Sequence, residues 1–172
     1  MVLELILKSL YFFLPAYVAN MAPILLRWIP FANRPVSKRL FGENKTWRGL
    51  LVGTLAGGLI FALQKWAHQQ GFQELALIDY NDFSLLLGFL LGLGALLGDL
   101  VKSYYKRKAE IAPGRPWIPF DQIDFVIGGL ALGFFIYVPP VEVAVVLLII
   151  SPLLHVLVNY IGYLLKINKC KI

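Results

Sequence analysis

Residues 83–108 read FSLLLGFLLGLGALLGDLVKSYYKRK, an apolar run that turns abruptly polar. No charged residue occurs up to Leu97, whereas the part from Asp99 onward holds one acid and four bases. About 20 apolar residues of helix span the hydrocarbon core of a bilayer. The stretch therefore predicts a membrane helix over about 83–101 that continues as a charged helix to Lys108.

Four other runs are also long and apolar enough to cross a bilayer, so we predict five spans. The chain has 172 residues, of which 59% are hydrophobic, and its mean hydropathy is +0.72. Such a composition is typical of a polytopic membrane protein. The first run is too long for a cleaved signal peptide, so we interpret it as a permanent span. The predicted fold is all-α, a single transmembrane domain over residues 1–172, whose other spans cover about 3–26, 47–66, 120–138 and 141–165.

The distribution of charge predicts the orientation of these spans. Fourteen of the sixteen Lys and Arg residues lie in or beside two connections, about 27–46 and 102–119, and after the last span. The connection 69–82 holds three acids and no base. Because basic loops stay in the cytoplasm, we expect the N-terminus outside and the C-terminus in the cytoplasm of a multi-pass protein of the cell membrane.

Glycines recur at a spacing of four within the middle spans. Small residues at this spacing let helix backbones approach closely in lipid. The pattern predicts tight packing between spans, and room for a ligand is the alternative for some of these positions. The glycines concerned are Gly49, Gly53 and Gly57, then Gly88 with Gly92, Gly94 with Gly98, and Gly129 with Gly133.

Polar side chains form one stripe along the charged end of the 83–108 helix. Positions i, i+3, i+4, i+7 and i+8 share a helical face. Bases at a helix end also snorkel to lipid headgroups, which is an alternative explanation for this end. It does not explain Asp99, one turn deeper, and an ionisable residue within a span indicates a function. The stripe comprises Asp99, Lys102, Ser103, Lys106 and Arg107.

Two further acids, Asp121 and Asp124, share a face at the start of the 120–138 run. The helix dipole favours acids there, so helix capping is the alternative for Asp121. The predicted topology puts both acids on the same side of the membrane as Asp99. Three poorly hydrated carboxylates repel one another, and a divalent cation relieves that repulsion. Oxygen ligands without His or Cys indicate Mg²⁺ rather than zinc.

A basic segment, FGENKTWRG at 41–49, lies just before the 47–66 run. Asn44 and Thr46 suit helix N-caps, while Lys45 and Arg48 can bind phosphate. An ordinary basic flank of a membrane helix is the alternative. Added to Lys106, Arg107 and Arg115, the segment predicts a basic surface at the cytoplasmic edge of the bilayer. Acids, a divalent cation and bases together favour phosphoryl or nucleotidyl transfer from a polyphosphate, with an acceptor that arrives from the bilayer.

Other polar residues within the spans have a simpler explanation. We expect Asn20, His155 and Asn159 to form hydrogen bonds between helices. Cys170 is the single cysteine, so the chain holds no internal disulfide and no cysteine-based metal site.

The two cytoplasmic motifs, GDLVKSYYKR (98–107) and PFDQIDFVIGG (119–129), together resemble the signature of the membrane cytidylyltransferases. In phosphatidate cytidylyltransferases that signature runs Gly-Asp, Ser, Lys-Arg, Pro-Gly-His-Gly-Gly, Asp-Arg and Asp. Here the His-Gly-Gly element is absent and Gln122 replaces the Arg. With NKTWRG (44–49), this shorter version is similar to the archaeal branch, the CDP-archaeol synthase family, over effectively the whole chain. Glu43 departs from the family pattern, which usually has Lys there.

The resemblance implies that CMP passes from CTP to digeranylgeranylglyceryl phosphate, an isoprenoid lipid phosphate of archaeal phospholipid synthesis. The products are CDP-archaeol and pyrophosphate, and Mg²⁺ is the implied cofactor. The implied metal ligands and catalytic residues are Asp99, Asp121 and Asp124, with Lys106 as a further catalytic residue. The implied substrate-binding residues are Asn44, Lys45, Thr46, Arg48, Ser103, Arg107, Arg115 and Gln122. The implied partners are CTP, the lipid phosphate and the bilayer, with no nucleic acid or protein partner.

Two other functions compete with this interpretation. A small transporter or channel for an anionic, phosphate-containing substrate would use the basic surface as an entry vestibule. It predicts polar residues through the membrane midplane, where the three middle runs have almost none. A CDP-alcohol phosphotransferase needs Asp-Gly followed by Ala-Arg, and GDLVKSYYKR does not match that pattern.

Overall fold

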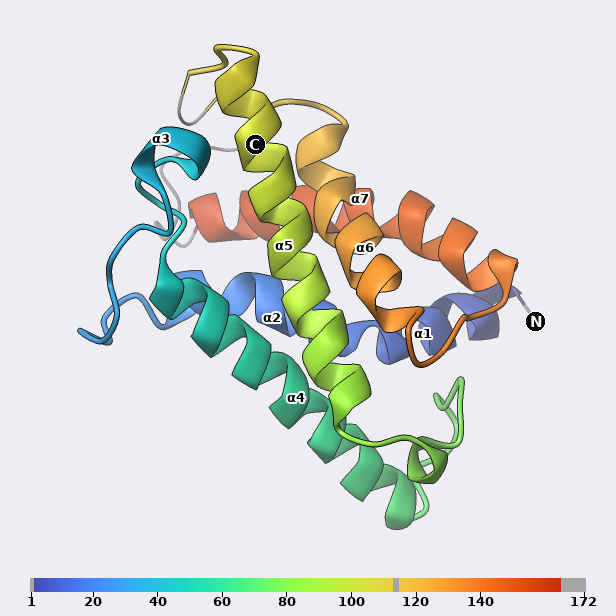
Figure 1. Cartoon of the computed structure of the whole chain (residues 1–172). Helices are drawn as coiled ribbons and strands as arrows, with labels where there is room; N and C mark the ends of the chain where they lie inside the picture. Colours follow the sequence, from blue (N-terminus) through green and yellow to red (C-terminus); the bar gives the residue numbers. More distant parts are fainter. Residues whose placement is uncertain (1, 113–114, 165–172) are drawn as a thin grey trace.

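The structure, a computed structural model, describes residues 2–112 and 115–164, and every regular element in these ranges is a helix (Figure 1). One isolated antiparallel bridge pairs Pro35 with Thr46. The predicted all-α class is therefore confirmed. Pro113 and Gly114, the basic segment after residue 165 with Cys170, and the Asn159 side chain lie outside the described part. The helices are α1 (Val2–Phe12), α2 (Leu14–Leu25), α3 (Lys38–Phe41), α4 (Trp47–Gln69), η1 (Tyr80–Asp82), α5 (Leu86–Lys108), α6 (Phe120–Gly133) and α7 (Val141–Leu164).

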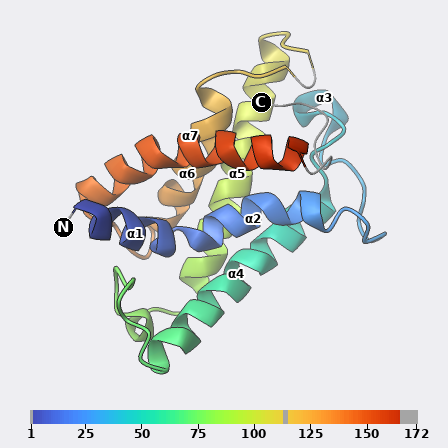
Figure 2. The same cartoon turned by 180° about the vertical axis from the view of Figure 1, so that it is seen from behind.

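Helix α5 lies at the centre and packs against α2, α4 and α6. In the two opposite views, α1, α2 and α7 run across the α5–α6 pair and cover one side of it (Figures 1 and 2). Buried aromatic and aliphatic side chains fill the space between these layers, so the burial of apolar surface holds the layers together. They include Phe12, Phe13, Phe61, Leu91, Phe125 and Val126.

The helices differ from the five predicted spans in length and straightness. Three of them, Trp47–Gln69, Leu86–Lys108 and Val141–Val158 within α7, are long and apolar enough to cross a membrane. The predicted span 3–26 is instead two helices with a bend of 50° between them, a pair that forms either one broken span or a re-entrant loop. Pro15 lies in the first turn of α2, where its missing N–H cannot continue the hydrogen bonds of α1.

The predicted span 120–138 is shorter than expected, because α6 ends at Gly133. At 1.5 Å per residue, its 14 residues extend about 21 Å, less than the roughly 30 Å of a bilayer core. After Gly133 the backbone closes turns, with the Tyr137 amide donating to the Gly133 carbonyl. Pro139 and Pro140 follow and cannot donate to a helix. The predicted continuation of the 83–101 span to Lys108 is confirmed in α5.

Helix α4 has two distinct faces. Gly49, Gly53 and Gly57 are buried on one face. Leucines at a spacing of four are exposed on the other, namely Leu51, Leu55, Leu59 and Leu63. Small residues inside and large apolar residues outside are typical of a helix that packs against protein on one side and lipid on the other. The prediction of tight packing through spaced glycines is therefore confirmed here.

Helices α5 and α6 approach each other most closely through glycines. A Cβ atom on Gly98 would lie 2.1 Å from the Asp124 carbonyl oxygen, and one on Gly128 would lie 2.2 Å from the Gly94 oxygen. Only glycine fits where two backbones approach this closely. Because Gly98 precedes Asp99 and faces Asp124, this contact brings acids of the two helices together.

Candidate active site

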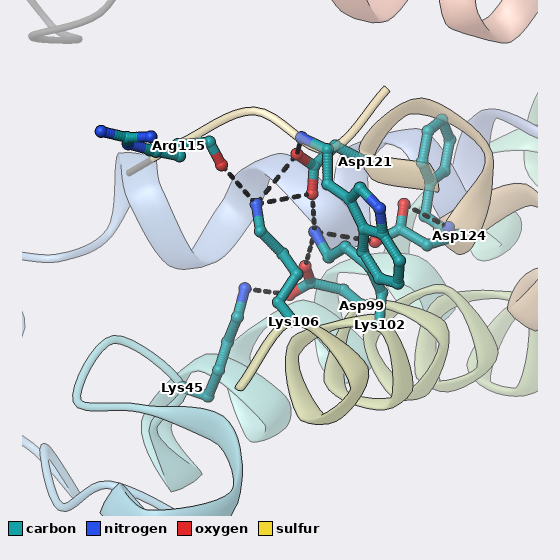
Figure 3. Close-up of polar contacts among 9 residues, drawn as sticks. Lys45, Asp99, Lys102, Lys106, Arg115, Asp121 and Asp124 are labelled. Carbon is teal, nitrogen blue, oxygen red and sulfur yellow. Dashed lines mark hydrogen bonds and ion pairs between the residues drawn. The ribbon is translucent and has the colours of Figure 1, made fainter. Parts of the chain in front are cut away.

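Three carboxylates surround the ammonium group of Lys102 (Figure 3). Its Nζ atom lies 2.9 Å from Asp99 Oδ1, 3.1 Å from Asp121 Oδ1 and 3.0 Å from Asp124 Oδ2. Asp99 and Lys102 come from α5, while Asp121 and Asp124 come from α6. The sequence prediction that these three acids lie together is borne out by this geometry.

We call Asp99, Asp121 and Asp124 the acid cluster. Two lysines besides Lys102 flank this cluster. Lys45, from the segment before α4, forms an ion pair with Asp99. Lys106 contacts both carboxylate oxygens of Asp121, at 3.1 and 3.0 Å. Lys106 also donates to the Arg115 carbonyl at 2.7 Å, which ties the α5–α6 connection to the cluster.

Asp121 does not cap α6, although it lies in the first turn. The N-cap residue of α6 is Pro119, and it has no side-chain cap hydrogen bond. Asp121 instead accepts a hydrogen bond of 2.5 Å from the Trp117 amide, in addition to its contacts with the lysines. The capping alternative for Asp121 is thus not supported, since the carboxylate faces the preceding connection and the cluster.

The acid cluster is poorly exposed and electrically balanced. The Asp124 side chain is 6% exposed, and those of Asp99 and Asp121 are each 17% exposed. Buried charges need partners and hydrogen bonds to be tolerated. Lys45, Lys102 and Lys106 supply one positive charge for each negative charge.

The cluster forms one wall of a cavity of about 1000 Å³. The polar wall includes Asn44, Lys45, Asp99, Lys102, Lys106, Arg115, Asp121, Gln122 and Asp124. The opposite wall is mostly apolar and comes from α2 and α7, with Tyr17, Met21, Ile24, Leu25, Leu154, Val158 and Ile161. One cavity therefore presents both charged and apolar surfaces.

Several predicted binding residues line this cavity while also stabilising the fold. Thr46 caps α4 by accepting from the Gly49 amide at 3.1 Å. The buried Arg48 donates through Nη1 to the carbonyls of Arg27 and Ile29, at 2.7 and 2.8 Å. Gln122 is buried, and its Oε1 atom has no hydrogen-bond partner among the described residues. An unpaired buried acceptor is costly, so Gln122 is available to a donor in the cavity.

Ser103 and Arg107 do not line the cavity, although they belong to the predicted stripe. At 3.6 residues per turn, Lys102 and Lys106 lie about 60° and 20° to one side of Asp99, while Ser103 and Arg107 lie about 40° and 80° to the other. Helix α6 packs against the side of α5 on which Lys102 and Lys106 lie. Ser103 is buried and Arg107 is partly exposed, and the Arg115 guanidinium extends away from the acid cluster (Figure 3).

The structure also brings together residues that the sequence prediction did not assign to the site. Lys102 belongs to the predicted stripe without an assigned role, and its i+3 spacing from Asp99 is the signal in the sequence that points to the site. His155 of α7 lines the cavity and stacks on Phe125, with ring centroids 5.9 Å apart. Tyr17 and Ser151 share a hydrogen bond of 2.6 Å between α2 and α7. No local pattern in the sequence indicates these contacts between distant helices.

The donor set suits a hard divalent cation. Carboxylate oxygens are the ligands that Mg²⁺ prefers, and three of them already share one cationic group. Within residues 2–112 and 115–164, no three His, Cys, Asp or Glu side chains form a ready metal-binding group. Each of the three carboxylates is paired with lysine in this structure.

The chain is similar to known proteins over nearly its whole length. The chain matches the family described as CarS-like, CDP-archaeol synthase, over residues 2–171. It is 36% identical to the CDP-archaeol synthase of Thermococcus onnurineus, with 95% of each chain covered. It is 38% identical to that of Methanopyrus kandleri, with 94% of this chain and 91% of the relative covered.

A solved structure is similar as well. It was described as giving "structural insight into an intramembrane enzyme for archaeal membrane lipids biosynthesis". The TM-score is 0.69 and the identity 33%, over 90% of this chain and 94% of the other. Sequence and structure thus agree over nearly the whole length, and the chain belongs to the CDP-archaeol synthase family.

Proposed function

We propose that the cavity is where CTP and a lipid phosphate react. As a member of its family, the chain is a CTP-dependent nucleotidyltransferase of archaeal lipid synthesis. A phosphate oxygen of the lipid bonds to the α-phosphorus of CTP, the bond from that phosphorus to the β-phosphate oxygen breaks, and pyrophosphate leaves. The observation that carries the assignment is the meeting of three aspartates and three lysines in one cavity.

The lysines are suited to hold the triphosphate. Lys45 and Lys106 line the cavity and reach the acid cluster from two directions. Ammonium groups bind phosphate oxygens strongly where water is scarce. Asn44 and Gln122 line the same wall and offer amide groups to the nucleotide. Positioning and charge neutralisation of this kind account for most of the catalysis of phosphoryl transfer.

Asp99, Asp121 and Asp124 are the residues that would hold Mg²⁺. When bound, the ion neutralises charge on the phosphates and orients them for displacement. The chain's own task is to keep these carboxylates close together, which the glycine contact between α5 and α6 supports. The lipid phosphate is already ionised at neutral pH, so its attack needs no strong general base.

The apolar wall suits the isoprenoid chains of the acceptor. Met21, Ile24 and Leu25 of α2 form this wall together with Val158 and Ile161 of α7, and all five side chains are more than a third exposed. An apolar wall that reaches the lipid-facing surface favours entry of the acceptor from the bilayer, because its chains need not cross water.

The active site would face the cytoplasm, with one transmembrane domain over residues 1–172 and the N-terminus outside. The bases of the connections 27–46 and 102–119 support this orientation through the positive-inside rule. CTP is a charged, water-soluble substrate, so a site at this surface needs no passage through the membrane.

A turnover assay tests the proposal. Purified chain in detergent receives labelled CTP, Mg²⁺ and digeranylgeranylglyceryl phosphate, and a labelled CDP-lipid is expected. Chelation with EDTA should stop the reaction, and Mg²⁺ should restore it. The substitution Asp124→Asn should abolish turnover with the chain still folded, whereas Glu142→Gln, far along the sequence at the start of α7, should change little. A folded chain that forms no CDP-lipid, or an active Asp124→Asn variant, would contradict the assignment.

A further inference from the structure

Lys102 lies in the position of a cation shared by three carboxylates. Its ammonium contacts one oxygen of each aspartate at 2.9 to 3.1 Å, and its side chain is 15% exposed. Lys45 and Lys106, by contrast, each contact a single aspartate at the edge of the cluster. Lys102 is therefore the cation that joins the carboxylate of α5 to the two carboxylates of α6.

The charge balance makes this lysine and a divalent ion compete. Three aspartates and three lysines give the cluster no net charge. Adding a doubly charged ion beside an ammonium group in a poorly hydrated place is unfavourable, because like charges repel strongly there. The same three oxygens also cannot close around both cations at once.

We propose that Lys102 is an exchangeable internal cation, which holds the acid cluster together until a divalent ion takes its place. The inference rests on the proposed function in taking these aspartates as the metal ligands. The displaced ammonium stays in the cavity, which Lys102 lines, and its flexible four-carbon stem lets it turn to the phosphates that arrive with the ion. Metal binding and nucleotide binding are thereby coupled, since the phosphates receive the charge that the carboxylates release.

This coupling predicts weak metal binding in the absence of nucleotide. Mn²⁺ serves as the probe, because its free form has a strong electron paramagnetic resonance signal that is lost on binding. The full chain in detergent, without CTP, is titrated with Mn²⁺. In the variant Lys102→Met, binding should tighten by about 30-fold, the factor for removing one charge about 4 Å from a divalent ion even at the dielectric constant of water.

Lys45→Met is the matched control. It removes the same charge from the cluster, but from a more exposed side chain that contacts Asp99 alone. Lys45 need not move when an ion binds, and water screens it better, so its removal should tighten binding by only about threefold. Equal effects of the two substitutions would show that net charge alone matters, and would overturn the exchange.

Stability gives a second readout that does not depend on activity. The unfolding temperature of Lys102→Met should fall in chelator and recover when Mn²⁺ is added, whereas that of the parent chain and of Lys45→Met should respond little. A Lys102→Met chain that stays unfolded with Mn²⁺ present would show that the ion cannot replace the ammonium, and would also overturn the proposal. These measurements use neither CTP nor the lipid substrate. Their result can therefore be interpreted even if the turnover assay detects no CDP-lipid.

Discussion

The substitution Gly98→Ala tests whether the contact between α5 and α6 builds the active site. The new Cβ would lie 2.1 Å from the Asp124 carbonyl oxygen, and ordinary contact begins at 3.4 Å, so the helices must separate by about 1.3 Å. Added to the 3.0 Å between Lys102 and Asp124, that shift takes the pair to about 4.3 Å, beyond ion-pair range. Overpacking of this kind costs about 1–3 kcal/mol, and a misplacement of about 1 Å at an active site costs about 100-fold in rate.

The assay measures turnover of labelled CTP into CDP-lipid together with the unfolding temperature in detergent. Gly98→Ala should lower both. Gly133→Ala is the matched control in α6, because its Cβ would meet only a terminal methyl of Leu91, at 2.9 Å. The clash involves a buried side chain two turns before Asp99 and not the backbone beside the aspartates, so stability should fall while turnover of the folded chain remains near that of the parent chain. A Gly98→Ala variant with normal turnover and stability would refute the argument that this contact positions the aspartates.

Two other substitutions separate structural from binding roles. Arg48→Met removes two hydrogen bonds that the charged guanidinium donates to the carbonyls of Arg27 and Ile29. The free energy of unfolding in detergent should therefore fall by about 2–4 kcal/mol. Unchanged stability with a much higher KM for CTP would instead assign Arg48 to substrate binding. Glu43→Lys should lower the KM for CTP by about threefold in low salt and by less in high salt. Glu43 lines the cavity, so its negative charge opposes CTP, and its exposed ion pair with Lys38 contributes little to stability. A raised KM would show that the acid itself has a role.

The helical class and most helix positions could be predicted because lipid imposes a simple rule on sequence. A span must be long and apolar, and the runs that became α4, α5 and α7 follow that rule. The bend at Pro15 and the early end of α6 could not be predicted from hydropathy. Phe134 and Phe135 are as apolar as a helix requires, yet α6 ends before them and turns follow, with prolines at 139 and 140.

The acidic part of the site could be predicted, because the i, i+3 spacing of Asp121 and Asp124 places both acids on one helical face. Asp99 on one helix and the pair Asp121 and Asp124 on the next lie at the same membrane side once topology is assigned. The contribution of α2 and α7 could not be predicted, since Tyr17 and His155 reach the cavity only through contacts between distant segments. The side of the helix also mattered: Ser103 and Arg107 share the stripe with Lys106 but turn away from α6.

The glycine contact and the central lysine are two consequences of one constraint. Backbones that approach as closely as those at Gly98 and Gly128 hold α5 and α6 together beside the three acids. The side chains of Asp99, Asp121 and Asp124 are at most 17% exposed there, so the repulsion among them is poorly screened. A cation among these acids therefore stabilises the packing of α5 against α6. A lysine on α5 provides that charge from within the chain, in reach of all three acids. Tight packing that concentrates carboxylates for a metal ion thus favours an internal cation that holds them until the ion binds, and Lys102 is the residue placed to supply it.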